Sequence, residues 1–494
     1  MKTKFLESKA RLNQLNTALF ILLSGIPLVW ISGTMWKSDS DDLMPTLISI
    51  ENWRFLFWGH SRFGTLVPLL AKPFTEMETN LLFQNFIHAI SLIIFVYAVM
   101  KTLYRNEKKE SHRKYIFLIL VFFFLLTNYV YLELLISGLP YAAPLGLFGL
   151  SLLLINSQLN KKLVVPIMVV LCALSCWVNP LHGFYLAPFL FLLIALKNFK
   201  SIFYELVLCY LLFTFGLFFI VLGLANGEIS GTVAPSFKAF GFFNWWFSLF
   251  VIQIALFILG LVRKNLKKNY AIYVSFAITW ISVYALSSLR HIYYNANAPR
   301  YFITATFISM CITMYLITIN IKEIINFQGR ESIWLRKVML QPAITAALAS
   351  LFISNIFLVS HLLSDIPLKQ PQKRLLSSLF LDGTNSYQFA AGDFWYAWPT
   401  KLYVDSPEKI FITSSMSQNQ YDVSTDSVES VRSRLADGDL GLCFGNINDC
   451  KNEIQAATFR IYGSLEFAVE VVDVRVITDT PILVSEVGLK VISK

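Results

Sequence analysis

The sequence predicts a polytopic α-helical membrane protein that carries a soluble α/β domain at its carboxyl end. Hydrophobic residues form 56% of the 494 residues, and charged residues form only 15%. Apolar runs of about 18 residues or more recur along the chain, which is the length that a membrane-spanning helix needs. These runs lack the alternation of a membrane β-barrel strand, so they favour helices. A polar composition returns only after residue 360.

About eleven spans are expected, and nine to eleven fit the pattern, because the short segments near Gly138 and between Val178 and Phe184 could be re-entrant. The expected spans are 17–36, 81–100, 115–135, 139–156, 163–178, 184–196, 202–224, 247–262, 270–288, 301–321 and 338–360. The first run is long and has no A-x-A-like cleavage site after it. We therefore expect it to remain as a span rather than to be removed as a signal peptide.

The distribution of basic residues predicts the orientation in the membrane. Segments assigned to one face hold 22 Lys and Arg, whereas the loops on the other face hold 7 before the carboxyl-terminal region begins. Because cytoplasmic loops are enriched in Lys and Arg, the amino terminus is expected in the cytoplasm. An odd number of spans then places residues 361–494 on the outer face. The net charge of +10 reflects this topology, and no nucleic-acid partner is expected.

Residues 361–494 are expected to fold separately from the membrane domain at 1–360. Segments rich in β-branched and aromatic residues predict strands at 409–413, 440–444, 465–476 and 482–487, and helices are expected at 427–436 and 452–462. Cys443 and Cys450 are the cysteines of this domain. In an oxidising outer compartment they predict a disulfide, and two free thiols are the alternative.

The first outer loop, 37–80, concentrates carboxylates and aromatic residues beside the membrane. Asp39, Asp41 and Asp42 follow the first span directly. Carboxylates are costly near hydrocarbon, so acids at this depth indicate a functional site. The alternative is an acidic, aromatic interfacial loop that only connects two spans.

The pair Asp41-Asp42 is followed by the segment Trp58-Gly59-His60-Ser61-Arg62 before the second span. With many spans and an outer α/β domain, this arrangement resembles the GT-C class of polyprenyl-phosphate-sugar glycosyltransferases, and within it the bacterial serotype-converting O-antigen glucosyltransferases. In that family an aspartate pair precedes a W…GR-like stretch. Here His60-Ser61 precedes the arginine instead, so the alignment of Arg62 departs from the family pattern.

The resemblance implies a multi-pass enzyme of the bacterial inner membrane whose carboxyl-terminal domain is periplasmic. It would move a hexose, glucose in the related enzymes, from undecaprenyl phosphate to O-antigen or another lipid-linked surface polysaccharide. The family requires no cofactor. Paired aspartates and a phosphate are also compatible with a divalent cation such as Mg²⁺ or Mn²⁺.

Transfer from a lipid phosphate needs a base for the acceptor hydroxyl and positive charge for the leaving phosphate. Adjacent side chains diverge in extended backbone, so one aspartate is expected to be the base and the other to be structural or to bind a metal. Asp42 is slightly favoured as the base over Asp41, and the sequence does not separate the two. Guanidinium groups grip phosphate in a bidentate fork. The candidate phosphate ligands are Arg62, Arg290, Arg300 and His291. Arg300 could instead anchor the following span at the headgroups.

Aromatic and polar side chains of the outer segments are candidates for binding the sugar or the acceptor: Trp58, His60, Tyr293, Tyr294, Asp393 and Trp395. For Tyr293 and Tyr294 the alternative is the aromatic belt at the membrane surface. For 389–398, which contains Asp393 and Trp395, the alternative is a buried core strand. His182, on the expected outer turn 179–183, could line the same cavity, and a structural role is the favoured alternative.

Two other functions remain open from the sequence: a flippase for lipid-linked oligosaccharides and an O-antigen polymerase. The sequence has no Walker A, H-E-x-x-H or G-x-S-x-G motif. The cytoplasmic loops are also too short for a nucleotide-sugar domain, which favours a donor that is already on a lipid carrier. A transporter would place ionisable residues at mid-membrane and show internal repeats, and neither is apparent in the sequence.

Overall fold

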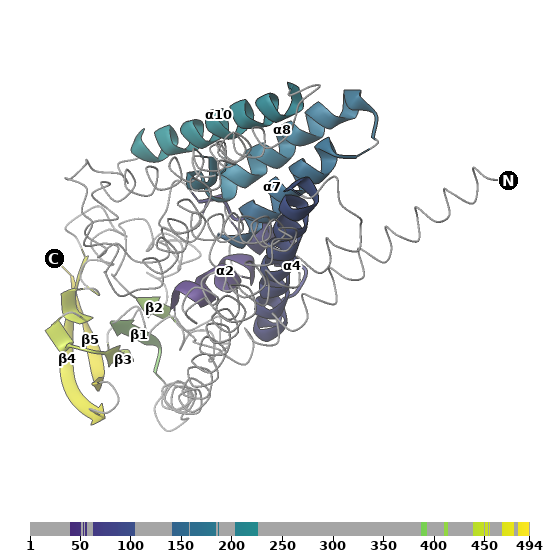
Figure 1. Cartoon of the computed structure of the whole chain (residues 1–494). Coiled ribbons are helices and arrows are strands. Elements are labelled where there is room, and N and C mark those ends of the chain that lie inside the picture. The colour runs from purple at the N-terminus through teal and green to yellow at the C-terminus, as the bar shows by residue number, and fades with distance from the viewer. Residues whose placement is uncertain are drawn as a thin grey trace, which may run out of the picture. The chain divides into compact units, whose positions relative to one another are not determined.

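A computed structural model describes about a third of the chain, in segments distributed from residue 40 to residue 493 (Figure 1). The described residues are 40–50, 53, 55–56, 63–103, 141–157, 159–183, 186, 203–225, 387–392, 410–412, 438–448, 450–452, 454, 467–478 and 483–493. The chain divides into two compact units. The first contains Met1–Thr34, Ser61–Leu66 and Asn85–His361, and the second contains Met35–His60, Val67–Gln84 and Leu362–Lys494.

Most of the described residues of the first unit are helical. Its helices are the greater part of α4 (Met77–Leu103), α7 (Ala142–Ile155), α8 (Lys161–Val178) and α10 (Phe203–Ala225). They overlap the expected spans 81–100, 139–156, 163–178 and 202–224. Two described helices are long and apolar enough to cross a membrane, Thr79–Thr102 and Phe203–Leu222, whereas α7 and α8 are apolar but shorter. Apart from Leu186, the other expected spans lie outside the described residues.

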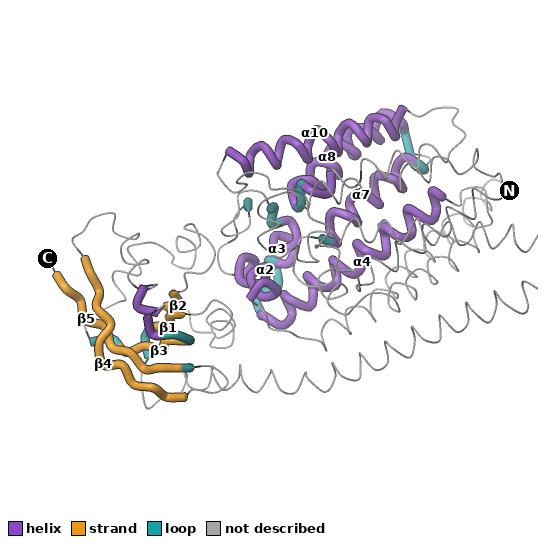
Figure 2. The backbone as a smooth tube through the Cα atoms, turned by 60° about the vertical axis from the view of Figure 1, so that its left-hand side comes forward, coloured by secondary structure: helices purple, strands orange, loops and turns teal. Residues whose placement is uncertain are grey.

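Helices α7 and α8 form an antiparallel hairpin, and its ends follow from local sequence. Asn160 caps α8, because its side-chain oxygen accepts a hydrogen bond from the Lys162 backbone N–H at 3.0 Å. At the other end, Asn179 adopts an extended conformation and stops α8 directly before Pro180. The Ser175 hydroxyl donates to the Pro144 carbonyl at 3.0 Å and joins the two helices there. Figures 1 and 2 show α10 beside this hairpin.

Two glycines bring α7 against α4. A Cβ at Gly146 would lie 2.5 Å from the Ser91 Cβ, and a Cβ at Gly149 would lie 2.8 Å from the Phe95 Cα. Such small residues allow membrane helices to approach closely. Further along, the Asn156 amide donates to the Thr102 hydroxyl at 3.4 Å. The paired positions advance together along both helices, so α4 and α7 run parallel with a nearly constant offset.

The second unit begins with α2 (Ser40–Ile50), α3 (Leu66–Ala71) except for Leu66, and the first two turns of α4. Asn80 holds these pieces together. Its amide nitrogen donates to the Ser49 hydroxyl at 2.8 Å and to the carbonyls of Ala71 and Phe74 at 3.0 and 2.7 Å. Its oxygen accepts from the Gln84 amide at 2.7 Å. The region expected as a loop at 37–80 therefore contains two helices tied to a third.

The second unit also contains a five-stranded mixed sheet (Figure 2). Its strands are β1 (Phe389–Gly392), β2 (Ile410–Ile412), β3 (Leu440–Phe444), β4 (Phe467–Thr478) and β5 (Val484–Ser493). The order is β2-β1-β3-β5-β4, with β1 parallel to β2 and β3, and β5 antiparallel to β3 and β4. Expected strands at 409–413, 440–444, 465–476 and 482–487 match β2 to β5, although β5 continues to Ser493.

The core of the sheet contains the cysteine pair that the sequence predicts. Cys443 on β3 and Cys450 form a disulfide, and both are fully buried together with Phe389. Chain after β3 turns helical at Ile447, because the Asn446 side chain caps the turn by accepting from the Asn448 N–H at 2.9 Å. The helix expected at 452–462 thus starts earlier. The helix expected at 427–436 lies outside the described residues.

Candidate active site

Asp41 and Asp42 occupy the first turn of α2, which begins at Ser40. The sequence interpretation placed them in extended backbone, and this was wrong: the backbone is helical. Successive positions on a helix are about 100° apart, so positions 41 and 42 do not share a helix face. A helix N-terminus carries partial positive charge, which stabilises carboxylates in its first turn. This accounts for an acidic pair being compatible with a helix here.

Helix α2 is a fixed element. The side chains of Met44, Leu47 and Ile48 are almost fully buried, and Ser49 is held by the Asn80 amide. Pro45 stands inside the helix, so the Asp41 carbonyl has no N–H four residues later to accept from. The aspartate pair is therefore built onto a packed helix, in the same compact unit as the five-stranded sheet.

Most of the other predicted site residues lie outside the described residues. They are Arg62, Arg290, Arg300 and His291 among the phosphate candidates, and Trp58, His60, Tyr293, Tyr294, Asp393 and Trp395 among the sugar and acceptor candidates. Asp393 and Trp395 follow β1 in the chain. Phe389–Gly392 itself is a buried strand, which matches the core-strand alternative for that part of 389–398.

Within the first unit, the segment that follows Arg62 is anchored to the end of α8. The Gly64 N–H donates to the Trp177 carbonyl at 2.8 Å. A Cβ at Gly64 would collide with the Trp177 indole, so only glycine allows this approach. Thr65 is also fully buried. The chain next to a predicted phosphate ligand is thus fixed at a helix end in the same unit.

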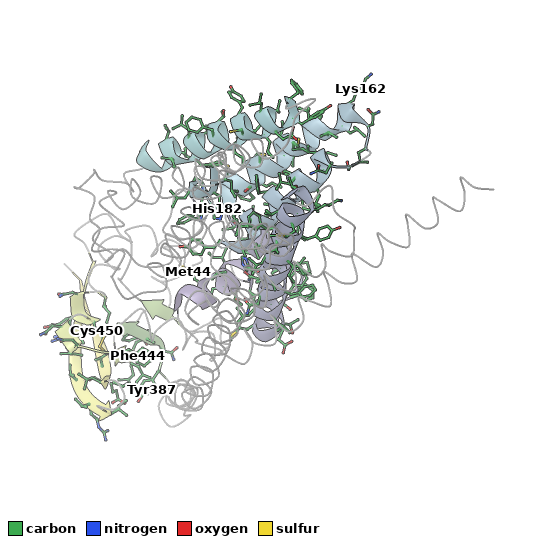
Figure 3. All side chains as sticks on the ribbon, in the orientation of Figure 1. Met44, Lys162, His182, Tyr387, Phe444 and Cys450 are labelled. Carbon is green, nitrogen blue, oxygen red and sulfur yellow. A yellow bond between two sulfur atoms is a disulfide. The ribbon has the colours of Figure 1, made fainter. Side chains whose placement is uncertain are left out.

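His182 lies in the same region of the first unit, just past the carboxyl end of α8, whereas Lys162 lies at the other end of that helix (Figure 3). Its Nε2 lies 3.1 Å from the Tyr141 carbonyl, which accepts the ring N–H. Burial lowers the pKa of His182 to about 3, so the ring is neutral near pH 7. His182 therefore joins the end of the α8 region to the start of α7, in agreement with the structural role expected from the sequence.

Sequence reasoning missed a line of polar residues on α4. Asn80, Gln84, Asn85 and His88 are all buried, and Asn85 and His88 are 5% and 1% exposed. The signal was present as polar residues at positions 80, 84, 85 and 88, which fall on one side of a helix at the start of an otherwise apolar span. Ionisable residues inside membrane helices indicate functional sites.

Among the residues that the structure describes, no three His, Cys, Asp or Glu side chains come together as a metal site would need. The side chains of Asp41 and Asp42 are not among those described. The expectation that a divalent cation is compatible with the aspartate pair thus remains a prediction.

Comparisons with known proteins do not assign the chain to a family. No protein-family model matches it, and no curated protein matches it significantly. Among solved structures, it is similar to the oligosaccharyltransferase of Archaeoglobus fulgidus in complex with Zn and sulfate, at 13% identity. The match covers 94% of this chain and 73% of that chain, with a TM-score of 0.38. A TM-score of this size does not establish a common fold.

Proposed function

We propose that the chain is a glycosyltransferase of the bacterial inner membrane, with its active site on the periplasmic side. It moves a hexose, glucose in our proposal, from undecaprenyl phosphate to O-antigen or another lipid-linked surface polysaccharide. The observation that carries this proposal is the pair Asp41-Asp42 in the first turn of a packed helix, directly after the first predicted span.

In the proposed reaction, Asp42 accepts the proton of an acceptor hydroxyl, with Asp41 as the second candidate. The hydroxyl oxygen then bonds to the anomeric carbon of the hexose. The bond between that carbon and the phosphate oxygen breaks, and undecaprenyl phosphate leaves with the bonding electrons. Arg62, Arg290, Arg300 and His291 are proposed to stabilise the leaving phosphate. No cofactor is required in this scheme.

Membrane placement is supported by the surface of α10. One side of this helix exposes large apolar side chains along most of its length: Phe203, Leu206, Tyr210, Phe213, Leu217, Phe218 and Val221. Exposed to water, such a continuous apolar face would be unfavourable, whereas contact with lipid chains suits it. The opposite side of α10 packs on α8, where Cys176 donates to the Leu212 carbonyl.

The orientation is supported by basic residues at one end of the first unit. Lys101 lies in the last turn of α4, and Lys162 lies exposed in the first turn of the oppositely directed α8. Asn156 and Thr102 hydrogen-bond at that same end. Enrichment in Lys is typical of the cytoplasmic side, so the end with Tyr141 and His182 is proposed to face the periplasm.

The decisive experiment measures sugar transfer in membrane vesicles of both orientations, supplied with a radiolabelled polyprenyl-phosphate hexose. The parent is compared with Asp41→Asn and Asp42→Asn. Loss of a general base lowers turnover by about 100-fold or more, so one variant should lose transfer while it inserts normally. If both variants transfer like the parent, the aspartate pair is not catalytic.

The alternatives are separate outcomes of the same experiment. Movement of labelled lipid between leaflets without transfer by the parent would identify a flippase. Lengthening of the polysaccharide, rather than addition of single hexoses, would identify a polymerase.

A further inference from the structure

Helix α4 buries four side-chain polar atoms that have no hydrogen-bond partner among the residues that the structure describes. They are the side-chain oxygens of Gln84 and Asn85 and both ring nitrogens of His88. Gln84 keeps the hydrogen bond that its amide nitrogen donates to Asn80, whereas Asn85 and His88 are neighbours on the helix, three positions apart. Leaving buried polar atoms unpaired costs free energy, so a native protein rarely does so without a role for them. This pair therefore indicates a site where something else supplies the partner.

The packing of α4 on α7 places His88 beside the start of α7. Positions 91, 95 and 102 of α4 pair with positions 146, 149 and 156, a nearly constant offset. His88 shares a helix face with Ser91 and Phe95, because residues three, four and seven apart lie on one side. The same offset sets His88 opposite Ala142, the first residue of α7.

The start of α7 is a buried helix end whose capping side chain is missing. Ala142 and Ala143 are 0% and 4% exposed. The N-cap residue, Tyr141, makes no side-chain hydrogen bond to the first turn. Pro144, the third residue, has no N–H to contribute. The N–H groups of the first turn have no acceptors within the helix, and they carry its partial positive charge.

The donors that the described residues supply at this place are uncharged. A neutral imidazole offers one N–H, the helix end offers backbone N–H groups, and an Asn side chain offers its amide once it is rotated. Helix N-termini bind phosphate groups well, and they disfavour cations. Uncharged donors also avoid burying a permanent positive charge in a membrane-spanning region when no anion is bound.

We propose that His88 and Asn85 of α4, together with the first turn of α7, bind the phosphate group of a lipid carrier, in addition to the arginines and His291 proposed to stabilise that phosphate as it leaves. That the phosphate belongs to a polyprenyl lipid rests on the proposed function. The site lies 14 residues from Thr102 along α4, which is about 21 Å from the basic end of the unit. This depth falls inside a hydrocarbon layer of about 30 Å, where a lipid-attached phosphate needs protein donors in place of water.

Other buried polar groups of α4 provide controls. Thr102 lies on the same helix, buried, with its hydroxyl donating to the Ala98 carbonyl at 2.8 Å. Thr102→Val removes a polar group whose hydrogen bonds are already made. His88→Leu removes the unpaired ring at nearly constant volume, whereas His88→Gln keeps an N–H donor.

The experiment uses the full chain in lipid nanodiscs and measures binding of a short-chain polyprenyl monophosphate, the matching polyprenol and inorganic phosphate. His88→Leu should weaken polyprenyl phosphate binding about 10-fold or more, because a hydrogen bond to a charged group is lost. Binding of the polyprenol should stay unchanged. His88→Gln should retain most of the affinity, and Thr102→Val should bind as the parent does.

Equal affinity of His88→Leu and the parent for polyprenyl phosphate would overturn the proposal, as would a parent that binds no phosphate compound. Binding of inorganic phosphate alone, lost in His88→Leu, would keep the anion site and reject the lipid source. The proposed function fails separately: a parent that binds polyprenyl phosphate through His88 but transfers no sugar has the site without the transferase activity. If the parent transfers sugar and His88→Leu binds polyprenyl phosphate as the parent does, the transferase activity stands and this phosphate site is rejected.

Discussion

Asn80 and His88 lie on the same helix, two turns apart, and their surroundings are opposite in kind. Asn80 makes four hydrogen bonds that join α2, the end of α3 and the turn at Phe74 to α4. His88 is equally buried, yet neither ring nitrogen is paired within the described part of the chain. A buried polar residue with all its bonds made serves the fold, whereas one with none indicates that a ligand supplies them. Within one helix, Asn80 is thus a polar residue that stabilises the fold, and His88 is a polar residue that is available to a ligand.

The comparison is tested most strongly by Asn80→Ala. It removes four hydrogen bonds and leaves the buried Ser49 hydroxyl and the Phe74 carbonyl without this donor, whereas the Ala71 carbonyl keeps the Phe74 N–H. We therefore expect a loss of about 4 kcal/mol in the free energy of unfolding. Unfolding of the purified chain in detergent, followed by circular dichroism, measures the change. Asn80→Asp keeps the shape but not the donor, and it should be nearly as unstable. Native stability in either variant would show that the network is dispensable.

His88→Leu should have the opposite effect on stability. Because it replaces a buried, unpaired ring with an apolar side chain of similar volume, the chain should be as stable as the parent or more stable by about 1 kcal/mol. The same unfolding measurement, without added lipid, gives the difference. A destabilised variant would mean that the ring has partners that hold the fold, and His88 would then belong with Asn80.

His182 offers a third case, a buried imidazole with a defined partner. Burial lowers its pKa to about 3 in the folded chain, below the 6.5 of an exposed histidine. The unfolded chain therefore binds more protons between these values, and stability should fall as pH drops from 6.5 towards 3, by about 1.4 kcal/mol per pH unit. His182→Gln should remove this slope while it keeps a donor for the Tyr141 carbonyl. Identical pH profiles for parent and variant would contradict the assignment.

Parts of the fold that depend on local pattern could be predicted from the sequence. The run at 202–224 became α10, and Leu440–Phe444 is a strand at the expected residues, since length and side-chain type decide such elements. Helix α2 was missed, because acidic residues and Pro45 resemble a loop when they are read without their packing. The helix dipole and the buried residues near Ile48 favour the helix instead.

The candidate sites were predictable to a smaller degree. Asp41 and Asp42 stand out because acids beside a membrane run are locally unusual. His88 is hidden in the average hydropathy of an apolar span, and its importance depends on which helix lies opposite. That partner is set by Gly146 and Gly149, more than fifty residues away, and no periodicity in α4 specifies it. Long-range register of this kind follows from three-dimensional packing alone.

The glycine contacts of α7 have a consequence for how the site could be altered from a distance. A single methyl group at Gly146 would meet the Ser91 side chain and backbone at 2.5 to 2.8 Å, so the helices would have to separate or slide. Either movement shifts the start of α7 relative to His88, without touching a polar atom of the phosphate site. The close approach of α4 and α7 at Gly146 thus sets the distance between His88 and the first turn of α7. Gly146→Ala is a substitution that would change this distance.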